Sequence, residues 1–361
     1  MGSVSQTSFP FAPSPCSTQL RQRIAVATRE IQKKALALDV NALALPPYAA
    51  TYLGKIFTQL PAVLRKQSYL LEHAICATGD PGRTVLVDHG GGMGIMSLLA
   101  RHAGVGHVIY NDINPISCSA AQLLADKLGA KAHDYVCGGI PHLQEFLTDQ
   151  QLNVSALTSS NVIEHVYDLN HFAEMLSNLG NPDLTLAMAT NIVDENRRRR
   201  RRFMAYHRKL EQRGRGTGSP SYLSIRDKLI RSHAPTLGDD CVRQLASRTR
   251  GQAKDDILRV VNRFLSDKAL PPEPEHPTNT CDPESGDTCD RLLPAAQLAA
   301  PFERVGFHVR ILSGFYAPDG RASLDRFARK SANLAIRMMG RHGLAISPFL
   351  TIHAQRMLIA Q

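Results

Sequence analysis

A glycine-rich loop between an apolar run and an amphipathic run constrains the fold of this chain more than any other segment. Residues 85–87 are a short apolar run typical of a buried strand, and residues 95–103 have the spacing of a helix. Between them, residues 88–94 place glycines at alternate positions, which permit positive φ and the close approach of a ligand. The start of the helix offers unpaired backbone N–H groups to an anionic group. This order predicts a ligand-binding βα unit of a parallel sheet.

Short apolar runs and amphipathic segments alternate on both sides of this loop, which is typical of an α/β fold. We expect a Rossmann-like, mostly parallel seven-stranded sheet with helices on both faces. The predicted strands are 84–87, 107–111, 130–136, 154–159, 183–189, 307–312 and 349–354. The predicted helices of the core are 95–103, 115–128, 169–179, 294–305 and 324–341.

The alternation stops twice, and these breaks suggest the domain organisation. We expect a disordered leader over 1–18, an N-terminal helical cap over 19–84 and the first part of the core over 85–192. A helical basic insertion with a Pro-rich linker should follow strand five over 193–292, and the core should resume over 293–361. Within the insertion, residues 269–290 are rich in Pro, Glu and Thr, which predicts a disordered linker.

Cysteine usage and hydropathy favour a cytoplasmic protein. The seven cysteines are scattered without a CxxC pair, so neither a zinc site nor a disulfide framework is predicted. No stretch reaches the roughly 18 apolar residues that span a bilayer. The first residues lack the apolar core of a signal peptide, so we do not expect export or membrane attachment.

The net charge of +10 belongs to one segment. Residues 195–231 contain thirteen Lys/Arg against three Asp/Glu, which equals the net charge of the whole chain. Six consecutive arginines, Arg197–Arg202, lie in this segment. Three interpretations stay open: a solvated helix face, a site for an anionic small substrate, and a nucleic-acid surface. Aromatic residues are sparse among these arginines and the chain has no Trp, which does not favour base stacking.

The spacing of the glycines distinguishes between two kinds of nucleotide-binding loop. The dinucleotide fingerprint G-x-G-x-x-G/A is incomplete, because Ser97 stands in its third place. The pattern D-x-G-x-G-x-G is complete at Asp88, Gly90, Gly92 and Gly94. It resembles the first motif of class I S-adenosylmethionine-dependent methyltransferases.

Three further segments resemble the ubiquinone-biosynthesis-type branch of this family. Residues 159–166, Ser-Ser-Asn-Val-Ile-Glu-His-Val, resemble the segment that follows its fourth strand. Thr190 and Asn191 are similar to the end of its fifth strand, and residues 302–307 resemble the helix-to-strand junction before its sixth. The resemblance implies S-adenosyl-L-methionine as cofactor and methyl transfer as the reaction. Our first hypothesis for the acceptor is an O or N nucleophile of a small molecule, with an anionic acceptor left open.

The resemblance also implies roles for single residues. The methionine end of the cofactor would be held by Asp88, Gly90, Gly91, Gly92 and Gly94. Asp112, at the end of the second predicted strand, is placed to accept hydrogen bonds from both ribose hydroxyls. Ile113 would lie against the adenine, and Asn161 and Val162 would line the sulfonium side. Asp134, with Val136 as the alternative, would cap the third strand beside the adenine.

Two residues after the fourth strand are candidates for acid–base chemistry. Glu164 and His165 follow the carboxyl end of that strand, where open α/β sheets bind ligands, and a histidine suits a general base near neutral pH. The same pair could instead cap or pack the following helix. His89, within the glycine loop, is expected to stabilise the loop by a hydrogen bond.

The alternatives concern the acceptor and the chemistry. One is an RNA or protein methyltransferase that docks through the arginine-rich insertion. The others are a non-catalytic cofactor-binding or scaffold protein and a dinucleotide oxidoreductase.

Overall fold

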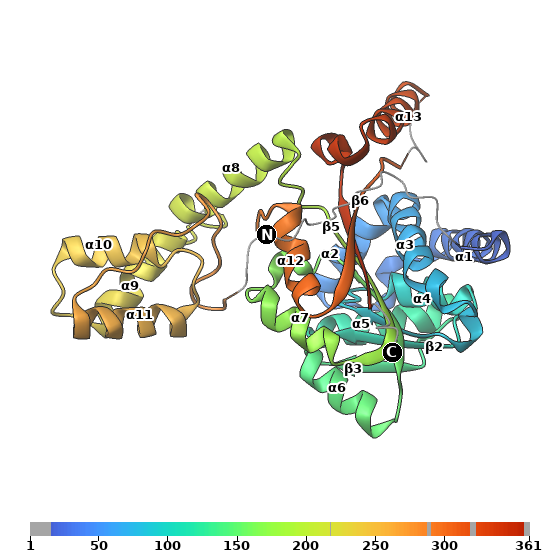
Figure 1. Ribbon diagram of the computed structural model, residues 1–361, viewed down its shortest axis with the longest axis horizontal. Helices are drawn as coiled ribbons and strands as arrows, with labels where there is room; N and C mark the ends of the chain where they lie inside the picture. The colour runs from blue at the N-terminus through green and yellow to red at the C-terminus, as the bar shows by residue number, and fades with distance from the viewer. Residues whose placement is uncertain (1–15, 217, 287–289, 318–322, 357–361) are drawn as a thin grey trace. The chain divides into compact units, whose positions relative to one another are not determined.

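The computed structural model describes residues 16–216, 218–286, 290–317 and 323–356 (Figure 1). Contacts divide the chain into two compact units. The first contains the residues up to Ile163, Asp168–Asn191 and the residues from Ala295 on; the second contains Glu164–Tyr167 and Ile192–Pro294. In the described part of the chain, no helix is both long and apolar enough to span a bilayer.

The first unit is built on a seven-stranded sheet with the order β3-β2-β1-β4-β5-β7-β6. Strands β1 to β5 are parallel, and their order is that of a Rossmann fold. The strand bounds are β1 Val85–His89, β2 His107–Asp112, β3 Asp134–Cys137, β4 Val154–Ser160, β5 Gly180–Thr190, β6 Phe307–Ser313 and β7 Leu350–Arg356.

The sheet is mixed, because β7 runs antiparallel to both β5 and β6. Ser313 at the end of β6 pairs with Leu350 at the start of β7, so the chain enters β7 at the edge where it left β6. A parallel strand would need a crossover to the opposite edge of the sheet. The sheet therefore has the seven strands that were expected, but one of them, β7, is antiparallel.

Helices cover both faces of this sheet. On one face of the sheet, α3, α4 and α5 contact the strands and α1 packs on these helices. On the other face lie α6, α7 and α12. The bounds are α1 Thr18–Leu36, α2 Pro47–Thr58, α3 Leu60–Ile75, α4 Ile95–His102, α5 Pro115–Leu128, α6 Ile140–Asp149, α7 Leu169–Ser177, α12 Ala295–Arg304 and α13 Ser323–Met338. Short 3-10 turns are η1 Val40–Leu43, η2 Cys76–Thr78, η3 Pro81–Arg83, η4 Ile163–His165 and η5 Gly340–Ile346.

The N-terminal helices complete one of the two helical layers. Leu64 and Leu71 of α3 belong to the same buried cluster as Leu99 of α4 and Ala187 of β5. The expected disordered leader ends earlier than residue 18, because Cys16 is buried and Ser17 caps α1 by accepting a hydrogen bond from the Leu20 N–H at 3.2 Å. Residues 1–15 of that prediction lie outside the described residues.

The second unit contains four helices with an apolar core of their own. They are α8 Arg197–Arg213, α9 Tyr222–His233, α10 Asp239–Arg248 and α11 Lys254–Asp267. Ile230, Leu245 and Val261 are fully buried in that core.

The linker predicted to be disordered is ordered where the structure describes it. Thr280 and Cys281 are buried, and Asn279 exchanges two hydrogen bonds with the backbone of Leu292, at 2.9 and 3.0 Å. The prediction was wrong because composition does not show that these polar groups find partners within the unit. Residues 287–289 lie outside the described part.

Candidate functional site

The carboxyl edge of the sheet gathers most of the predicted cofactor-binding residues. Asp88 and His89 end β1, Asp112 ends β2 and Ser160 ends β4 immediately before Asn161. Parallel strands bring these ends to one edge, where open α/β sheets bind ligands. The start of β7 joins the same edge, because Leu350 pairs with Thr190 at the end of β5.

The glycine loop takes a conformation that side chains would prevent. Gly90, Gly92 and Gly94 have φ values of 65°, 54° and 71°, a region disfavoured for residues with a Cβ. The turn is closed by the Gly94 N–H, which donates to the Gly91 carbonyl at 2.8 Å. A Cβ on Gly90 would lie 2.2 Å from Cγ2 of Val162. The loop therefore packs directly against the residue predicted to line the sulfonium side.

Asp112 joins the loop to the end of β2. Its Oδ2 accepts a hydrogen bond from the Gly92 N–H at 2.8 Å, and its Oδ1 accepts one from the Asn114 N–H at 2.8 Å. The side chain is half-buried, and each carboxylate oxygen can accept a second hydrogen bond. Ile113, the next residue, is 77% exposed. A carboxylate with remaining acceptor capacity thus lies beside an exposed apolar side chain, which suits a ribose and an adjoining base.

Asp88 is buried and fixes the start of α4. Its Oδ2 accepts hydrogen bonds from both the backbone N–H and the hydroxyl of Ser97, at 3.0 and 2.7 Å. Burial raises the pKa of Asp88 to about 6, although the two hydrogen bonds from Ser97 lower it. The side chain at the first position of the motif therefore has a structural role in holding the loop on the helix.

The raised pKa of Asp88 predicts a measurable pH dependence of stability. Because the folded pKa is above the unfolded one, protonation favours the folded state, and this stability is lost as pH rises from about 4 to about 6. The free energy of unfolding of Asp88→Asn minus that of wild type should therefore increase by about 2–3 kcal/mol when the pH is raised from 4 to 7. Urea unfolding at both pH values measures the gain. Asp126→Asn, at an exposed carboxylate, is the control; a gain equal to that of the control would contradict the prediction.

His89 is held as a neutral imidazole by the network behind the loop. Asn111 donates its amide N–H groups to the carbonyls of Val136 and Gly138, at 3.0 and 2.8 Å, so its Oδ1 must accept. Nδ1 of His89, 2.7 Å from that oxygen, therefore carries the proton. Burial lowers the pKa of His89, which also favours the neutral ring. The bond agrees with the stabilising role expected for this residue.

Asn161 follows β4 in a left-handed conformation with φ 60°. Its N–H donates to the Ala189 carbonyl at 2.7 Å, and its Oδ1 accepts from the Asn191 N–H at 3.2 Å. Lys66 Nζ donates to Oδ1 of both Asn161 and Asn191, at 3.2 Å each. The ends of β4 and β5 are thus joined by one ammonium group.

Sequence reasoning missed Lys66 and Tyr52, which reach this edge from the N-terminal helices. Lys66 lies on α3 with its Nζ 5.2 Å from the ring centroid of Phe349. Tyr52 of α2 lies over the loop, because a Cβ on Gly92 would be 3.3 Å from its hydroxyl oxygen. Neither residue belongs to a motif, and the helical spacing around each indicates only an amphipathic helix. No local signal could have identified them.

Aromatic rings line the sheet edge next to Lys66. The ring centroids of Tyr69 and Phe315 are 5.5 Å apart, and those of Phe315 and Phe349 are 5.3 Å apart, both in edge-to-face geometry. Burial raises the pKa of Tyr69, so this phenol stays neutral. The edge therefore combines a cation with flat apolar surfaces.

The position predicted for Asp134 was wrong. Asp134 is the first residue of β3 and pairs with Ile109, whereas Cys137 pairs with Asp112 at the carboxyl edge. Its Oδ2 lies 2.6 Å from Nε2 of His107, at the start of β2. The strand begins at Asp134 and not at residue 130 as predicted. Asp134 therefore lies three residues, or about 10 Å, before the carboxyl end of β3. Cys137 and Gly138 stand beside Asp112 instead.

Glu164 and His165 belong to the second unit by their contacts. The Glu164 carbonyl accepts a hydrogen bond from the Arg291 N–H at 3.2 Å, and Nε2 of His165 lies 3.7 Å from Oδ1 of Asp290. Glu164 is buried and His165 is exposed. Their catalytic roles stay a prediction.

No protein-family model and no curated protein matches the chain. Solved structures are similar to parts of it. A S-adenosylmethionine-dependent methyltransferase from Mesorhizobium loti is 15% identical with a TM-score of 0.38, over 77% of this chain and 94% of that one.

Two other solved structures match smaller parts. A SAM-dependent methyltransferase from Aquifex aeolicus is 16% identical with a TM-score of 0.27, over 34% of this chain and 62% of that one. A structure concerned with converting a disulfide bond into a thioacetal group during echinomycin biosynthesis is 21% identical with a TM-score of 0.26, over 30% of this chain and 44% of that one.

Proposed function

We propose that the chain is a S-adenosyl-L-methionine-dependent methyltransferase that acts on an O or N nucleophile of a small anionic molecule. The observation that carries the proposal is the position of Asp112. Its carboxylate is fixed at the end of β2 by the Gly92 N–H at 2.8 Å, with the exposed Ile113 beside it. An acid in this position is suited to both hydroxyls of a ribose.

The described residues fit the cofactor in three respects. The loop lacks side chains at Gly90, Gly91 and Gly92, so backbone can approach the methionine end closely. Asp112 keeps acceptor capacity for the ribose, and Ile113 offers an apolar surface for the adenine. Asn161 and Val162 would line the sulfonium side, since Val162 contacts the loop at Gly90. When bound, the cofactor supplies an electrophilic methyl group on sulfur.

The contribution of the chain to the reaction would be mainly positioning. Holding a nucleophile in line with a methyl group removes much of the barrier to a displacement. A base is needed only where the nucleophile carries a proton near neutral pH. His165 is the candidate for this role, and Asp290 at 3.7 Å can orient its ring. Glu164 is the second candidate for acid–base chemistry.

Lys66 supports an anionic acceptor. Two amide oxygens, of Asn161 and Asn191, orient its ammonium at the sheet edge, at 3.2 Å each. Phe349 and Phe315 add flat apolar surface next to it. A carboxylate or phosphate on a small planar body matches a cation beside aromatic rings.

The test of the proposal is thermal stabilisation by S-adenosylhomocysteine. At about 100 times its Kd a ligand adds about 2.7 kcal/mol, so we expect Tm to rise by roughly 5 °C or more. Asp112→Ala should lower the affinity about 10- to 100-fold, because it removes hydrogen bonds to a charged group. Asp126→Ala, at an exposed acid paired with Lys131, should keep the full rise. A rise with NAD and none with S-adenosylhomocysteine would refute the cofactor assignment.

The acceptor is sought with labelled S-adenosylmethionine in metabolite extracts. We expect the labelled products to carry an anionic group. Labelled products that are all neutral would refute the role given to Lys66. Cofactor binding without any labelled product would favour a non-catalytic binding protein.

A further inference from the structure

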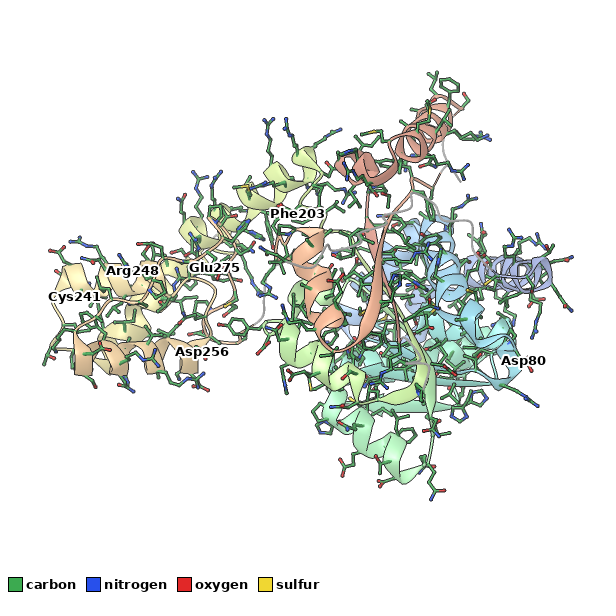
Figure 2. The ribbon with its side chains drawn as sticks, viewed as in Figure 1. Asp80, Phe203, Cys241, Arg248, Asp256 and Glu275 are labelled. Carbon is green, nitrogen blue, oxygen red and sulfur yellow. The ribbon has the colours of Figure 1, made fainter. Side chains whose placement is uncertain are left out.

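Seven cationic side chains lie on one side of α8, in two groups separated by residues 203–207. At 100° per residue they lie within an arc of about 160°, and the buried His207 and Leu210 lie on the opposite side of the helix. The face is about 24 Å long, from the first residue of α8 to its last. Figure 2 shows nitrogen-tipped side chains extending outward from this helix, on which Phe203 is labelled. All seven are exposed, and we call them the cationic face: Arg197, Arg198, Arg201, Arg202, Arg208, Lys209 and Arg213.

The members of the cationic face have no acidic partners, unlike most other arginines of the second unit that the structure describes. Elsewhere in the unit, arginines pair with acids, such as Arg231 with Asp227 at 2.8 Å and Arg248 with Glu273 at 3.2 Å. Within the described residues, none of the seven members forms an ion pair. Solvated surfaces of soluble domains usually mix charges of both signs. A surface of one sign over this length is suited to a polyanion.

Helix stability does not explain the cationic face. Four of its members, Arg197, Arg198, Arg201 and Arg202, lie in the first two turns, where the helix macrodipole is positive. Cations there are unfavourable by several tenths of a kcal/mol each, and like charges at i,i+4 repel. The helix begins with a cap, since the Arg199 N–H donates to Oδ1 of Asn196 at 3.2 Å. A bound polyanion would relieve both unfavourable terms.

We propose that the cationic face binds the phosphate backbone of a single nucleic-acid strand. Arginine forms bidentate hydrogen bonds with phosphate, and six of the seven members are arginines. Phosphates stand about 3.4 Å apart along a stacked strand, so a 24 Å face spans about seven of them. Tyr206, 45% exposed, lies at the border of the face, one helical turn from Arg202 and from Lys209, and offers a ring for stacking with a base.

An acidic membrane surface fits the same helix less well. Interfacial helices bury an apolar face among the lipids. On α8, which is described along its whole length, Tyr206 is the only large apolar side chain that is exposed. The proposal concerns binding alone and does not depend on methyl transfer.

The experiment is a salt titration of binding, by fluorescence anisotropy, of the full chain to a labelled 20-nucleotide single-stranded RNA without cofactor. With seven phosphate contacts we expect a slope of log K against log salt of about −5. The variant R197Q/R198Q/R201Q/R202Q should shift this slope by about 3 towards zero and bind at least tenfold more weakly. Its Tm should not fall, because glutamine favours helix and removes the repulsion.

The matched control removes four exposed cations from α10 and α11 of the same unit. The variant R243Q/K254Q/R259Q/R263Q has the same net charge and should keep the slope and affinity of wild type. Equal losses in both variants would overturn the proposal, because net charge alone would then explain binding. The absence of RNA binding by wild type would also overturn the proposal. Competition by polyglutamate or phosphatidylserine vesicles as strong as that by unlabelled RNA would overturn it too, in favour of an acidic protein or a membrane.

Discussion

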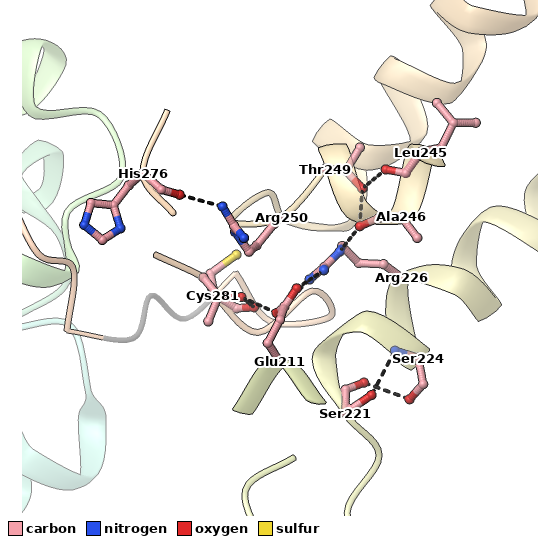
Figure 3. A network of polar contacts seen from close by, with 11 residues as sticks. Glu211, Ser221, Ser224, Arg226, Leu245, Ala246, Thr249, Arg250, His276 and Cys281 are labelled. Atoms are coloured by element: carbon pink, nitrogen blue, oxygen red, sulfur yellow. Dashed lines mark hydrogen bonds and ion pairs between the residues drawn. The ribbon is translucent and has the colours of Figure 1, made fainter. Parts of the chain in front are cut away.

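Glu211→Ala is expected to lower the free energy of unfolding of the second unit by about 3–5 kcal/mol, because it leaves a buried guanidinium without its counter-ion. Arg226 is fully buried, and both of its terminal nitrogens donate to the Glu211 carboxylate (Figure 3). Its Nε donates to the Ala246 carbonyl at 2.7 Å, and the Thr280 hydroxyl donates to Glu211 at 2.8 Å. Urea unfolding of wild type and variant measures the loss.

Two further variants test whether the loss comes from the buried ion pair between Arg226 and Glu211. Glu273→Ala removes a 70% exposed partner of Arg248 and should cost about 0–1 kcal/mol. The double variant Arg226→Met/Glu211→Leu replaces both charges by apolar groups and should recover most of the stability. If Glu211→Ala costs no more than Glu273→Ala, the pair does not contribute as argued.

The same ion pair explains why the Pro-rich linker is ordered. Glu211 lies on α8 and Arg226 on α9. Ala246 lies in the last turn of α10, and Thr280 belongs to the linker. The Arg250 guanidinium also donates to the carbonyl of His276 in the linker. The buried charges need these polar groups, and the linker supplies them. The second unit is therefore held together by these polar contacts in addition to its apolar core.

Local patterns in the sequence predicted the elements of the first unit well. The helix α5 was predicted with its observed bounds, because Asn114 caps it by accepting from the Ile116 N–H and Pro115 suits its first turn. The positions of the glycine loop and of Asp112 were also predicted, since their signals lie within one βαβ unit. The helix α6 was missed although Ile140, Leu143 and Leu147 have helical spacing, so its signal was present.

The features that were not predicted depend on contacts between distant residues. The antiparallel direction of β7 follows from the edge at which the chain enters it, which periodicity does not encode. Lys66 reaches Asn161 across 95 residues of sequence. The ordered linker needs Glu211, 69 residues away from Thr280. Each requires the tertiary structure, whereas helices and strands follow from neighbours in sequence.

Gly90→Ala is expected to lower the free energy of unfolding by about 2–5 kcal/mol. The positive φ of 65° costs about 1–2 kcal/mol for a residue with a Cβ. The new methyl group would lie 2.2 Å from Cγ2 of Val162, and such overpacking costs a further 1–3 kcal/mol or so. Because the loop must move to relieve this contact, the Tm rise with S-adenosylhomocysteine should also be lost. Urea unfolding and melting with and without the ligand measure the two effects.

A second substitution identifies the cause of the damage at Gly90. Val162→Ala removes the methyl group that meets the new Cβ, so Gly90→Ala/Val162→Ala should recover the overpacking cost and keep only the cost of the positive φ. Gly54→Ala is the matched control, because Gly54 lies inside α2 with no atom within 4 Å of its Cβ position, and alanine there should stabilise by about 0.5–1 kcal/mol. If the double variant is as unstable as Gly90→Ala, the contact with Val162 does not limit the loop. Recovery of stability without recovery of ligand binding would instead show that the glycine is needed for the approach of the ligand itself.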